Sequence, residues 1–244
     1  TSSNTTAAVP SSTAQGNISV QAEHVSLSNG STLSASTSGA GNAGNITIEA
    51  RTLASNMGDD GLPLNGAAPV TIASNSTGQG AAGTIFVRGP GGQAAETIAL
   101  SNTKIMANAS NATLPTPNSV GGELVERAHR PDFTPMRLSA DIELTAEKVA
   151  LVNGTVIQAD TSGGADAGSI TLNVGTLKTA AGPDGRVMVT STSNCQGCPG
   201  GQPGDIIIQG IPGVTPTALR RYVWVGRPLG EAGDVFEYYL AESL

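Results

Sequence analysis

The sequence predicts an all-β solenoid, in which short parallel strands stack coil upon coil. Three observations predict this fold: an internal repeat at a fixed offset, apolar residues that alternate with polar ones, and turns rich in glycine and asparagine. The composition agrees, because 32 of the 244 residues are glycine while only 13% are charged and 3% aromatic. An ordinary domain has about 25% charged residues and about 7% glycine. Such a composition is also compatible with disorder, and the periodicity argues against it.

The internal repeat is the strongest of these observations. Residues 16–53 align with residues 140–177 without a gap, at an offset of 124 residues. A degenerate third copy covers residues 96–107. Sandwiches and barrels rarely repeat side-chain identities at fixed offsets, whereas stacked coils place equivalent residues above one another. The identical pairs include Ile18/Ile142, Asn29/Asn153, Gly30/Gly154 and Ile46/Ile170.

Apolar and polar residues alternate inside each repeat, as in Ile-Thr-Ile at residues 46–48 and Ile-Thr-Leu at residues 170–172. A period of two predicts short strands with one buried face. Asn-Gly dipeptides at residues 29–30 and 153–154 separate the strands, together with glycine-rich runs. These turn residues supply the positive φ that tight corners need.

The corner glycines set the size of a coil. Gly44 follows Gly16 by 28 residues, and Gly83 follows Gly44 by 39 residues with an insertion over residues 56–68. Coils of this size hold three short strands each, as in a parallel β-helix. About seven such coils, about 4.8 Å apart, make a rod roughly 35 Å long.

The phrase GNAGNITIEARTL at residues 41–53, preceded by VSLSNGSTLSASTSGA at residues 25–40, resembles the repeats of filamentous-haemagglutinin-like exoproteins of two-partner secretion systems. The resemblance covers most of residues 16–210. It implies a right-handed β-helix that lies outside a bacterial cell and serves adhesion, a biofilm matrix or surface fibres. The N-terminal secretion domain of that family, with its Asn-Pro-rich motifs, is not found in this sequence.

Two segments depart from the coil pattern before its C-terminal end. Residues 1–15 are rich in Ser and Thr and predict either a solvated tail or a strand added to a neighbouring subunit. Residues 108–137 contain four prolines and several charged residues and predict a loop inserted between coils. Loops on a rigid scaffold often carry recognition.

The last segment, residues 211–244, contains five of the seven aromatic residues of the chain. Its composition predicts two strands around a Gly/Pro turn. The open end of a solenoid must be capped or joined to something, so the segment is either a cap or a self-association surface. Only the second role predicts a filament. The residues in question are Tyr222, Trp224, Phe236, Tyr238 and Tyr239.

The two cysteines lie in a CxxC sequence, Cys195 to Cys198. A redox CxxC usually opens a helix, and the Pro and Gly residues that follow Cys198 disfavour one. A zinc site would need two further ligands, and the only histidines, His24 and His129, are isolated. We therefore expect a local disulfide that closes a surface loop, as in an oxidising compartment.

The sequence does not predict an enzyme, a metal site or a cofactor site. Glycan-degrading β-helices need clustered carboxylates along one groove, and the outward strand positions singled out here are neutral hydroxyl residues. Asp59, Asp60 and Asp166 match turns better than calcium ligands. No phosphate-binding glycine motif is present. The outward hydroxyl residues are Ser19, Thr47, Thr71 and Thr171.

The net charge of the chain disfavours two classes of binding partner. With 12 Lys and Arg against 19 Asp and Glu, the net charge is −7, which disfavours nucleic acid and anionic membranes. No apolar run reaches the roughly 18 residues of a membrane-spanning helix. The Asn-x-Ser/Thr triplets are interpreted mainly as turn and ladder positions rather than glycan sites. They begin at Asn4, Asn17, Asn29, Asn45, Asn75, Asn108, Asn111 and Asn153.

Together these observations lead us to expect a secreted, non-enzymatic structural protein at a bacterial cell surface, whose partner is a further copy of itself joined end to end. One alternative is a carbohydrate-binding adhesin module that uses residues 108–137 and the threonine-lined faces to hold surface glycans. A glycan-degrading β-helix is the less favoured alternative, because the carboxylate cluster is missing.

Overall fold

The computed structural model describes residues 16–39, 41–78, 80–110, 141–162, 167–194 and 203–211, and the backbone of two further strands at 222–228 and 236–242. Within this part the regular structure is β-strand, apart from one 3-10 turn, η1 (Pro90–Gly92). The strands form two sheets whose neighbours are mostly parallel. The prediction of an all-β fold with parallel pairing, compatible with a solenoid, is therefore confirmed.

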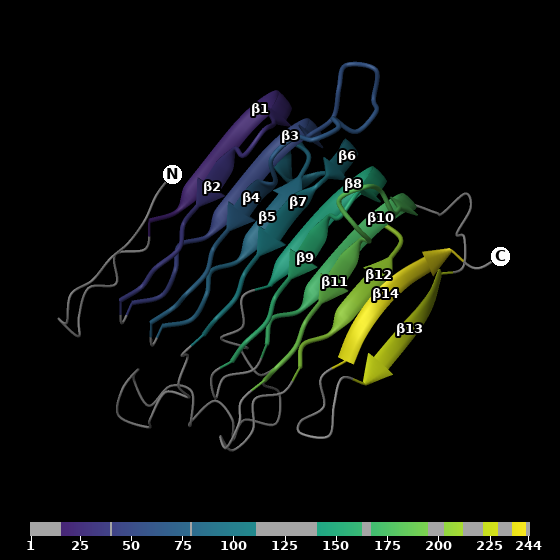
Figure 1. Ribbon diagram of the computed structural model, residues 1–244. Coiled ribbons are helices and arrows are strands. Elements are labelled where there is room, and N and C mark those ends of the chain that lie inside the picture. Colours follow the sequence, from purple (N-terminus) through teal and green to yellow (C-terminus); the bar gives the residue numbers. More distant parts are fainter. Residues whose placement is uncertain are drawn as a thin grey trace.

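Most consecutive strands alternate between the two sheets, and the strands run side by side along the molecule (Figure 1). Sheet 1 contains β1 (Ile18–Leu27), β3 (Ile46–Ser55), β5 (Ile85–Arg88), β6 (Ala95–Ser101), β8 (Ile142–Val152), β10 (Ile170–Ala180) and β12 (Ile206–Gln209). Sheet 2 contains β2 (Thr32–Ser34), β4 (Val70–Ala73), β7 (Thr103–Met106), β9 (Val156–Gln158), β11 (Met188–Thr190), β13 (Tyr222–Pro228) and β14 (Phe236–Glu242).

The strand register defines six coils in the described part, one fewer than the approximate number expected. They are coil 1 (β1, β2), coil 2 (β3, β4), coil 3 (β5 to β7), coil 4 (β8, β9), coil 5 (β10, β11) and coil 6 (β12). The isoleucine that begins each coil on sheet 1 pairs with the next one after 28, 39, 57, 28 and 36 residues. These isoleucines are Ile18, Ile46, Ile85, Ile142, Ile170 and Ile206.

The 124-residue repeat of the sequence is therefore a repeat of three coils. Ile18 and Ile142 occupy the same place in coils 1 and 4, as Ile46 and Ile170 do in coils 2 and 5. The basic coil has 28 residues, and the longer coils carry additional residues at their corners. A strand interior cannot accept an extra residue without turning its apolar side chains outward, whereas a corner can.

Sheet 1 supplies two of the three faces of each coil. In β3 the alternation of buried and outward residues is interrupted at Arg51 and Thr52, which both face outward. In coil 3 the strand is divided at this position by η1, and its halves β5 and β6 both pair with β3 and β8. With β4 and β7 on sheet 2, coils 2 and 3 therefore each have three short strand segments, as predicted from the coil length.

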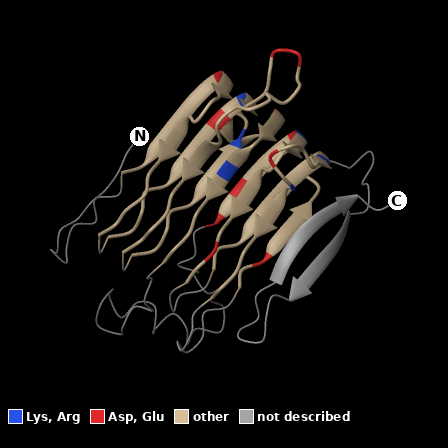
Figure 2. Ribbon diagram, viewed as in Figure 1, with Lys and Arg blue, Asp and Glu red and all other residues tan. Residues whose placement is uncertain are grey.

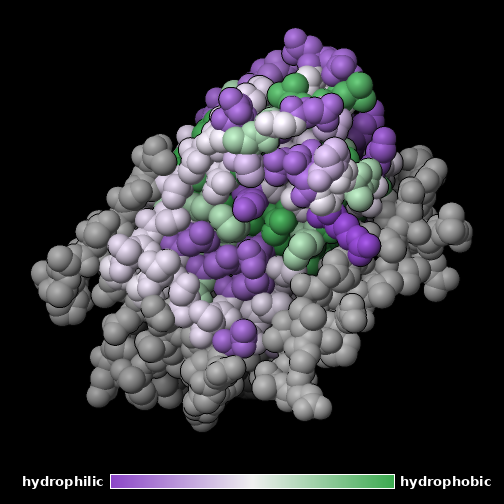
Figure 3. All heavy atoms as spheres, viewed as in Figure 1, coloured by the Kyte–Doolittle hydropathy of each residue, from purple (hydrophilic) through white to green (hydrophobic). Residues whose placement is uncertain are grey.

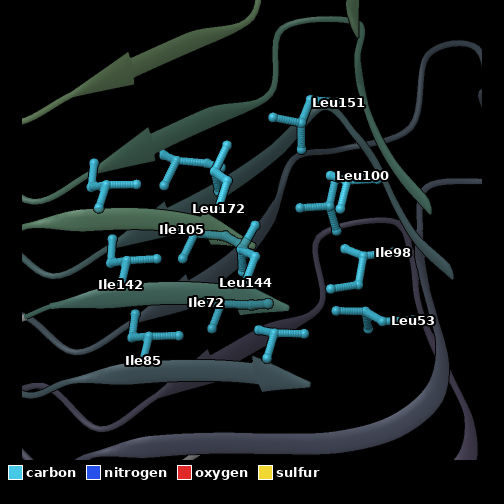
Figure 4. Packing of buried hydrophobic residues seen from close by; sticks show 14 of the residues in the cluster. Leu53, Ile72, Ile85, Ile98, Leu100, Ile105, Ile142, Leu144, Leu151 and Leu172 are labelled. Carbon is cyan, nitrogen blue, oxygen red and sulfur yellow. The ribbon is translucent and has the colours of Figure 1, made fainter. Parts of the chain in front are cut away.

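The core consists of aliphatic ladders that run from coil to coil. On sheet 1, Ile46, Ile85 and Ile142 follow one another in register, and each is 0% exposed. On sheet 2, Ile72 and Ile105 follow one another in the same way. Figure 4 shows these files of branched side chains between the sheets. Full burial of such a side chain contributes about 1.5–3 kcal/mol, so the column is held mainly by these files.

Asparagines line the corner between the sheets. Asn29, Asn56, Asn102 and Asn153 all have positive φ, between 43° and 53°, a conformation that asparagine tolerates better than most residues. The backbone N–H of Asn29 donates to Oδ1 of Asn56 at 2.9 Å, and Nδ2 of Asn56 donates to the carbonyl of Asn102 at 3.3 Å. The positive φ predicted at the two Asn-Gly turns is confirmed, with φ of 80° at Gly30 and 76° at Gly154.

Two further asparagines, directly before β1 and β3, contact the next coil. Oδ1 of Asn17 accepts from the backbone N–H of Asn45 at 2.8 Å, and Oδ1 of Asn45 accepts from the N–H of Thr84 at 2.9 Å. These contacts confirm the ladder role predicted for Asn17 and Asn45. The side-chain oxygen of each amide thus accepts a hydrogen bond from the next coil, which favours stacking of the coils.

The start of the loop predicted at residues 108–137 must be corrected. Oδ1 of Asn108 accepts from the N–H of Asp160 at 2.9 Å, and Ala109 forms parallel bridges with Ser76 and Thr161. Asn108 to Ser110 therefore belong to coil 3, because their backbone pairs with the coils on both sides. The rest of the predicted loop lies outside the described residues.

Candidate functional site

Coil 1 forms one end of the described solenoid and has an incomplete core. Its ladder residues are only half-buried, whereas their register partners Ile46, Ile48 and Ile72 in coil 2 are 0% exposed. Strands β1 and β2 are the edge strands of the two sheets. An edge strand offers unpaired backbone groups to a further strand. The half-buried ladder residues are Ile18, Val20, Val25, Leu27 and Leu33.

The two sheets end differently at the other end of the solenoid. Sheet 1 ends at the parallel strand β12, where Ile207 is 40% exposed. On sheet 2, β14 pairs antiparallel with β11 through Val189 and Tyr238, and β13 pairs antiparallel with β14 (Figure 1). The parallel ladder of sheet 2 therefore stops at β11.

The two strands predicted in residues 211–244 are present as β13 and β14. Tyr222 and Trp224 lie on β13, and Phe236, Tyr238 and Tyr239 lie on β14. The orientation of these five side chains lies outside the described part, so their role in self-association stays a prediction. The same holds for the disulfide predicted between the two cysteines, Cys195 and Cys198, and for residues 1–15.

Charged side chains on the outer face of sheet 1 pair across coils, and Figure 2 marks charged residues along these strands. Arg51 of coil 2 contacts Glu23 of coil 1 at 2.9 Å and Glu96 of coil 3 at 2.5 Å. Hydrogen bonds to the two carboxylates raise the pKa of Arg51, and the hydrogen bond from Arg51 lowers the pKa of Glu96. This triad links three successive coils.

A second polar cluster lies on the same face. Glu49 accepts from Nε2 of Gln21 at 3.0 Å and from Nε and Nη2 of Arg88 at 3.1 and 2.9 Å. The Arg88 guanidinium also lies over the ring of Phe86, 5.7 Å from its centroid, a cation–π contact. Thr47, one of the neutral outward positions singled out from the sequence, lies on this face, and Glu49 and Arg88 add charged positions that were not considered there.

These clusters could not be predicted from the pattern of any one strand. Glu49 and Arg88 are separated by 39 residues and become neighbours only through the coil register. In coils 4 to 6, Nδ2 of Asn173 donates to Glu143 at 3.0 Å, and Nε2 of Gln209 donates to Asn173 at 2.8 Å. Carboxylates held in this way by neighbouring coils help to align the coils.

The face viewed in Figure 3 is mostly hydrophilic, with apolar residues near its middle and near its top. Among the described residues, no group of three or more His, Cys, Asp or Glu side chains lies close enough to hold a metal ion. The same part of the chain contains no helix long and apolar enough to cross a membrane.

Comparisons with family models, curated proteins and solved structures found no match.

The charge triad should make the stability of the fold depend on pH. The pKa of Glu96 is lowered in the folded state, so its ion pair stabilises the fold above the unfolded pKa and is lost as the pH falls through the folded pKa. We expect Glu96→Gln to lower the melting temperature slightly near neutral pH. The difference from the wild type should vanish in acid, as measured by circular dichroism melts over a pH series.

Glu147→Gln is the matched control, because Glu147 is an exposed carboxylate on the next coil of the same sheet. It should melt like the wild type throughout the series. A Glu96→Gln difference that stays constant down to strongly acidic pH would contradict the assigned ion pair.

Proposed function

We propose that this protein is a non-enzymatic structural β-solenoid, displayed outside a bacterial cell, that joins with further copies end to end in a fibre, a biofilm matrix or an adhesive layer. The single observation that carries this proposal is the incomplete core of coil 1, whose ladder residues are half-buried on the edge strands of the two described sheets. The extracellular location rests on the resemblance to filamentous-haemagglutinin-like repeats.

We take the helix to be right-handed, as that resemblance implies and as parallel crossover connections almost always are. The antiparallel strands β13 and β14 then act at the C-terminal end as a cap on sheet 2 and as part of the docking surface. Their aromatic residues would supply anchors, since buried Trp and Tyr often dominate interface energetics.

Burial supports association at coil 1. A second copy resting on this end would complete the burial of its aliphatic residues, at about 25 cal/mol per Å² of apolar surface removed from water. It would also offer backbone partners to β1 and β2, the edge strands of the two described sheets. Both terms favour a partner that continues the ladder rather than a globular surface.

The other end of the same chain presents matching chemistry. The strand β12 reads Ile206-Ile207-Ile208-Gln209, and β1 begins Ile18-Ser19-Val20-Gln21. Both strands continue the same register, as shown by the pairs Ile170/Ile206 and Ile18/Ile46. A second copy is therefore the partner proposed for coil 1, with Ile206 seated on Ile18 of its neighbour. Because sheet 2 extends two strands beyond β11 and sheet 1 only one beyond β10, the neighbour must fit a stepped end.

Self-association is tested by electron microscopy and analytical ultracentrifugation of the purified full chain over a range of concentrations. We expect rods that lengthen with concentration. Monomers alone at high concentration would refute the proposal.

Ser19→Pro gives this test a specific variant. Ile18 donates its N–H to Asn45 of coil 2, so by alternation the N–H of Ser19 points to the open edge. Proline removes that donor and blocks strand addition. We expect association to weaken at least about tenfold, the equivalent of one lost edge hydrogen bond.

Ser19→Ala keeps the N–H and should associate like the wild type. Both variants should show the wild-type circular dichroism spectrum and melting temperature as monomers. Equal association of Ser19→Pro and the wild type would show that coil 1 is not the docking end.

A further inference from the structure

We propose that Asn65 is a site of spontaneous deamidation, and that the fold protects the other two Asn-Gly dipeptides of the chain from this reaction. The three dipeptides lie at residues 29–30, 65–66 and 153–154. They are chemically equal in an unfolded chain, so any difference in rate between them must come from the structure. This inference does not depend on the proposed function.

The reaction needs only water. The backbone nitrogen that follows the asparagine attacks Cγ of its side chain and forms a C–N bond. The bond from Cγ to Nδ2 breaks, and ammonia leaves with the proton of the attacking N–H. Water then opens either carbonyl of the resulting succinimide ring, giving aspartate or isoaspartate. A following glycine favours the attack because it has no side chain to hinder it.

Asn29 is held away from this path by the neighbouring coil. The N–H of Gly30, which supplies the attacking nitrogen, donates to the carbonyl of Ala68 at 3.1 Å. Oδ1 of Asn29, on the attacked carbonyl, accepts from the N–H of Ala68 at 3.3 Å. Both hydrogen bonds must break before ring closure, so the reaction is slowed.

Asn153 is held more firmly. It is 2% exposed, which limits access of water. Its Nδ2 donates to Oδ2 of Asp184 at 2.7 Å, and its Oδ1 accepts from the N–H of Asp184 at 3.0 Å. The amide is therefore fixed at both ends by one residue of coil 5.

Asn65 lies outside the asparagine file, in the coil 2 hairpin (residues 56–68) that projects beyond the end of β3 (Figure 1). Asn56 occupies the corner position of coil 2. Asn65 therefore belongs to the inserted hairpin and has no counterpart in the asparagine file. Asn65 and Gly66 are both exposed. Among the described residues, the side chain of Asn65 has no hydrogen-bond partner, and a Cβ at Gly66 would meet nothing within 4 Å.

The rest of the hairpin is well held, so the modification would act on a defined structure. Gly58 donates its N–H to the carbonyl of Leu62 at 2.8 Å, and Leu64 donates to the carbonyl of Asn56 at 2.8 Å. Deamidation adds one negative charge near Asp59 and Asp60, the acidic residues at the tip (Figure 2). Isoaspartate also lengthens the backbone by one carbon. The core files are untouched by either change.

The test is peptide mapping by mass spectrometry of the intact folded chain, incubated in mildly alkaline buffer for increasing times. Trypsin places the three dipeptides in separate peptides, bounded by Arg51, Arg88, Lys148 and Lys178. Because each protected site must break two hydrogen bonds, we expect Asn65 to deamidate at least about tenfold faster than Asn29 or Asn153. An isoaspartyl methyltransferase assay should label the same peptide.

A parallel incubation in denaturant provides the matched control, where the three rates should converge within a few fold. Asn65→Gln should abolish the fast phase and leave the melting temperature unchanged. The proposal is overturned if Asn29 or Asn153 reacts as fast as Asn65 in the folded chain. It is equally overturned if Asn65 stays intact when folded but reacts when unfolded.

Discussion

Ile46→Asp is expected to lower the free energy of unfolding by about 4 kcal/mol, because it places an ionisable group in a dry aliphatic file. Ile46 is 0% exposed and lies in register between Ile18 and Ile85. Neither neighbour can pair with a carboxylate. The loss is measured as a shift of the midpoint in denaturant unfolding followed by circular dichroism.

Thr47→Asp, one residue further along β3, is the control for this prediction. Thr47 faces outward between Ser19 and Phe86, so a charge there remains solvated. Its effect should stay within about 0.5 kcal/mol. Equal losses at both positions would show that the ladder faces are wrongly assigned.

Gly83→Ala is the second large prediction, with an expected loss of about 3 kcal/mol from overpacking. A Cβ at Gly83 would overlap the carbonyl oxygen of Gly44 in the preceding coil and Oγ of Ser74. These atoms cannot move independently, because Ser74 donates to the carbonyl of Gly44 at 2.5 Å and accepts from the N–H of Gly83 at 2.9 Å. Glycine is needed here for close approach, since φ at this position is not positive.

Gly91→Asn serves as its control. Gly91 has φ of 65°, which asparagine tolerates, and nothing lies within 4 Å of its missing Cβ. This variant should unfold close to the wild-type midpoint. A Gly83→Ala protein as stable as the wild type would mean that the coils are not in contact at this corner.

Much of the fold could be predicted from single residues and their spacing. The inward side chains of Ile46 and Ile170 follow from alternation, and the coil length follows from Gly16, Gly44 and Gly83. These features are local or strictly periodic, so each can be recognised from the order of the amino acids alone. The start of the loop after coil 3 could not be placed in this way, since Asn108 is tied to the coils on both sides by contacts with Asn75, 33 residues earlier, and with Asp160, 52 residues later.

The sequence likewise predicted only part of the candidate docking surfaces at the two ends of the solenoid. Composition identified the aromatic residues of the last segment, and patterning identified its two strands. That β14 joins sheet 2 antiparallel to β11, while β12 ends sheet 1 in parallel, depends on which edges remain available. The half-burial of Val20 and Leu27 likewise depends on their place in a coil that has a described neighbour on one side only.

By itself the sequence determined the class of fold, the inward files and the turn residues. The reason is that the two-residue period and the recurring corner residues are visible in the order of the amino acids. Only the tertiary structure decided which charges meet, which asparagine of three equal Asn-Gly pairs is unprotected, and where the ladder stops. Those properties arise from contacts between residues a whole coil apart, and the length of each coil depends on insertions that the local pattern does not measure.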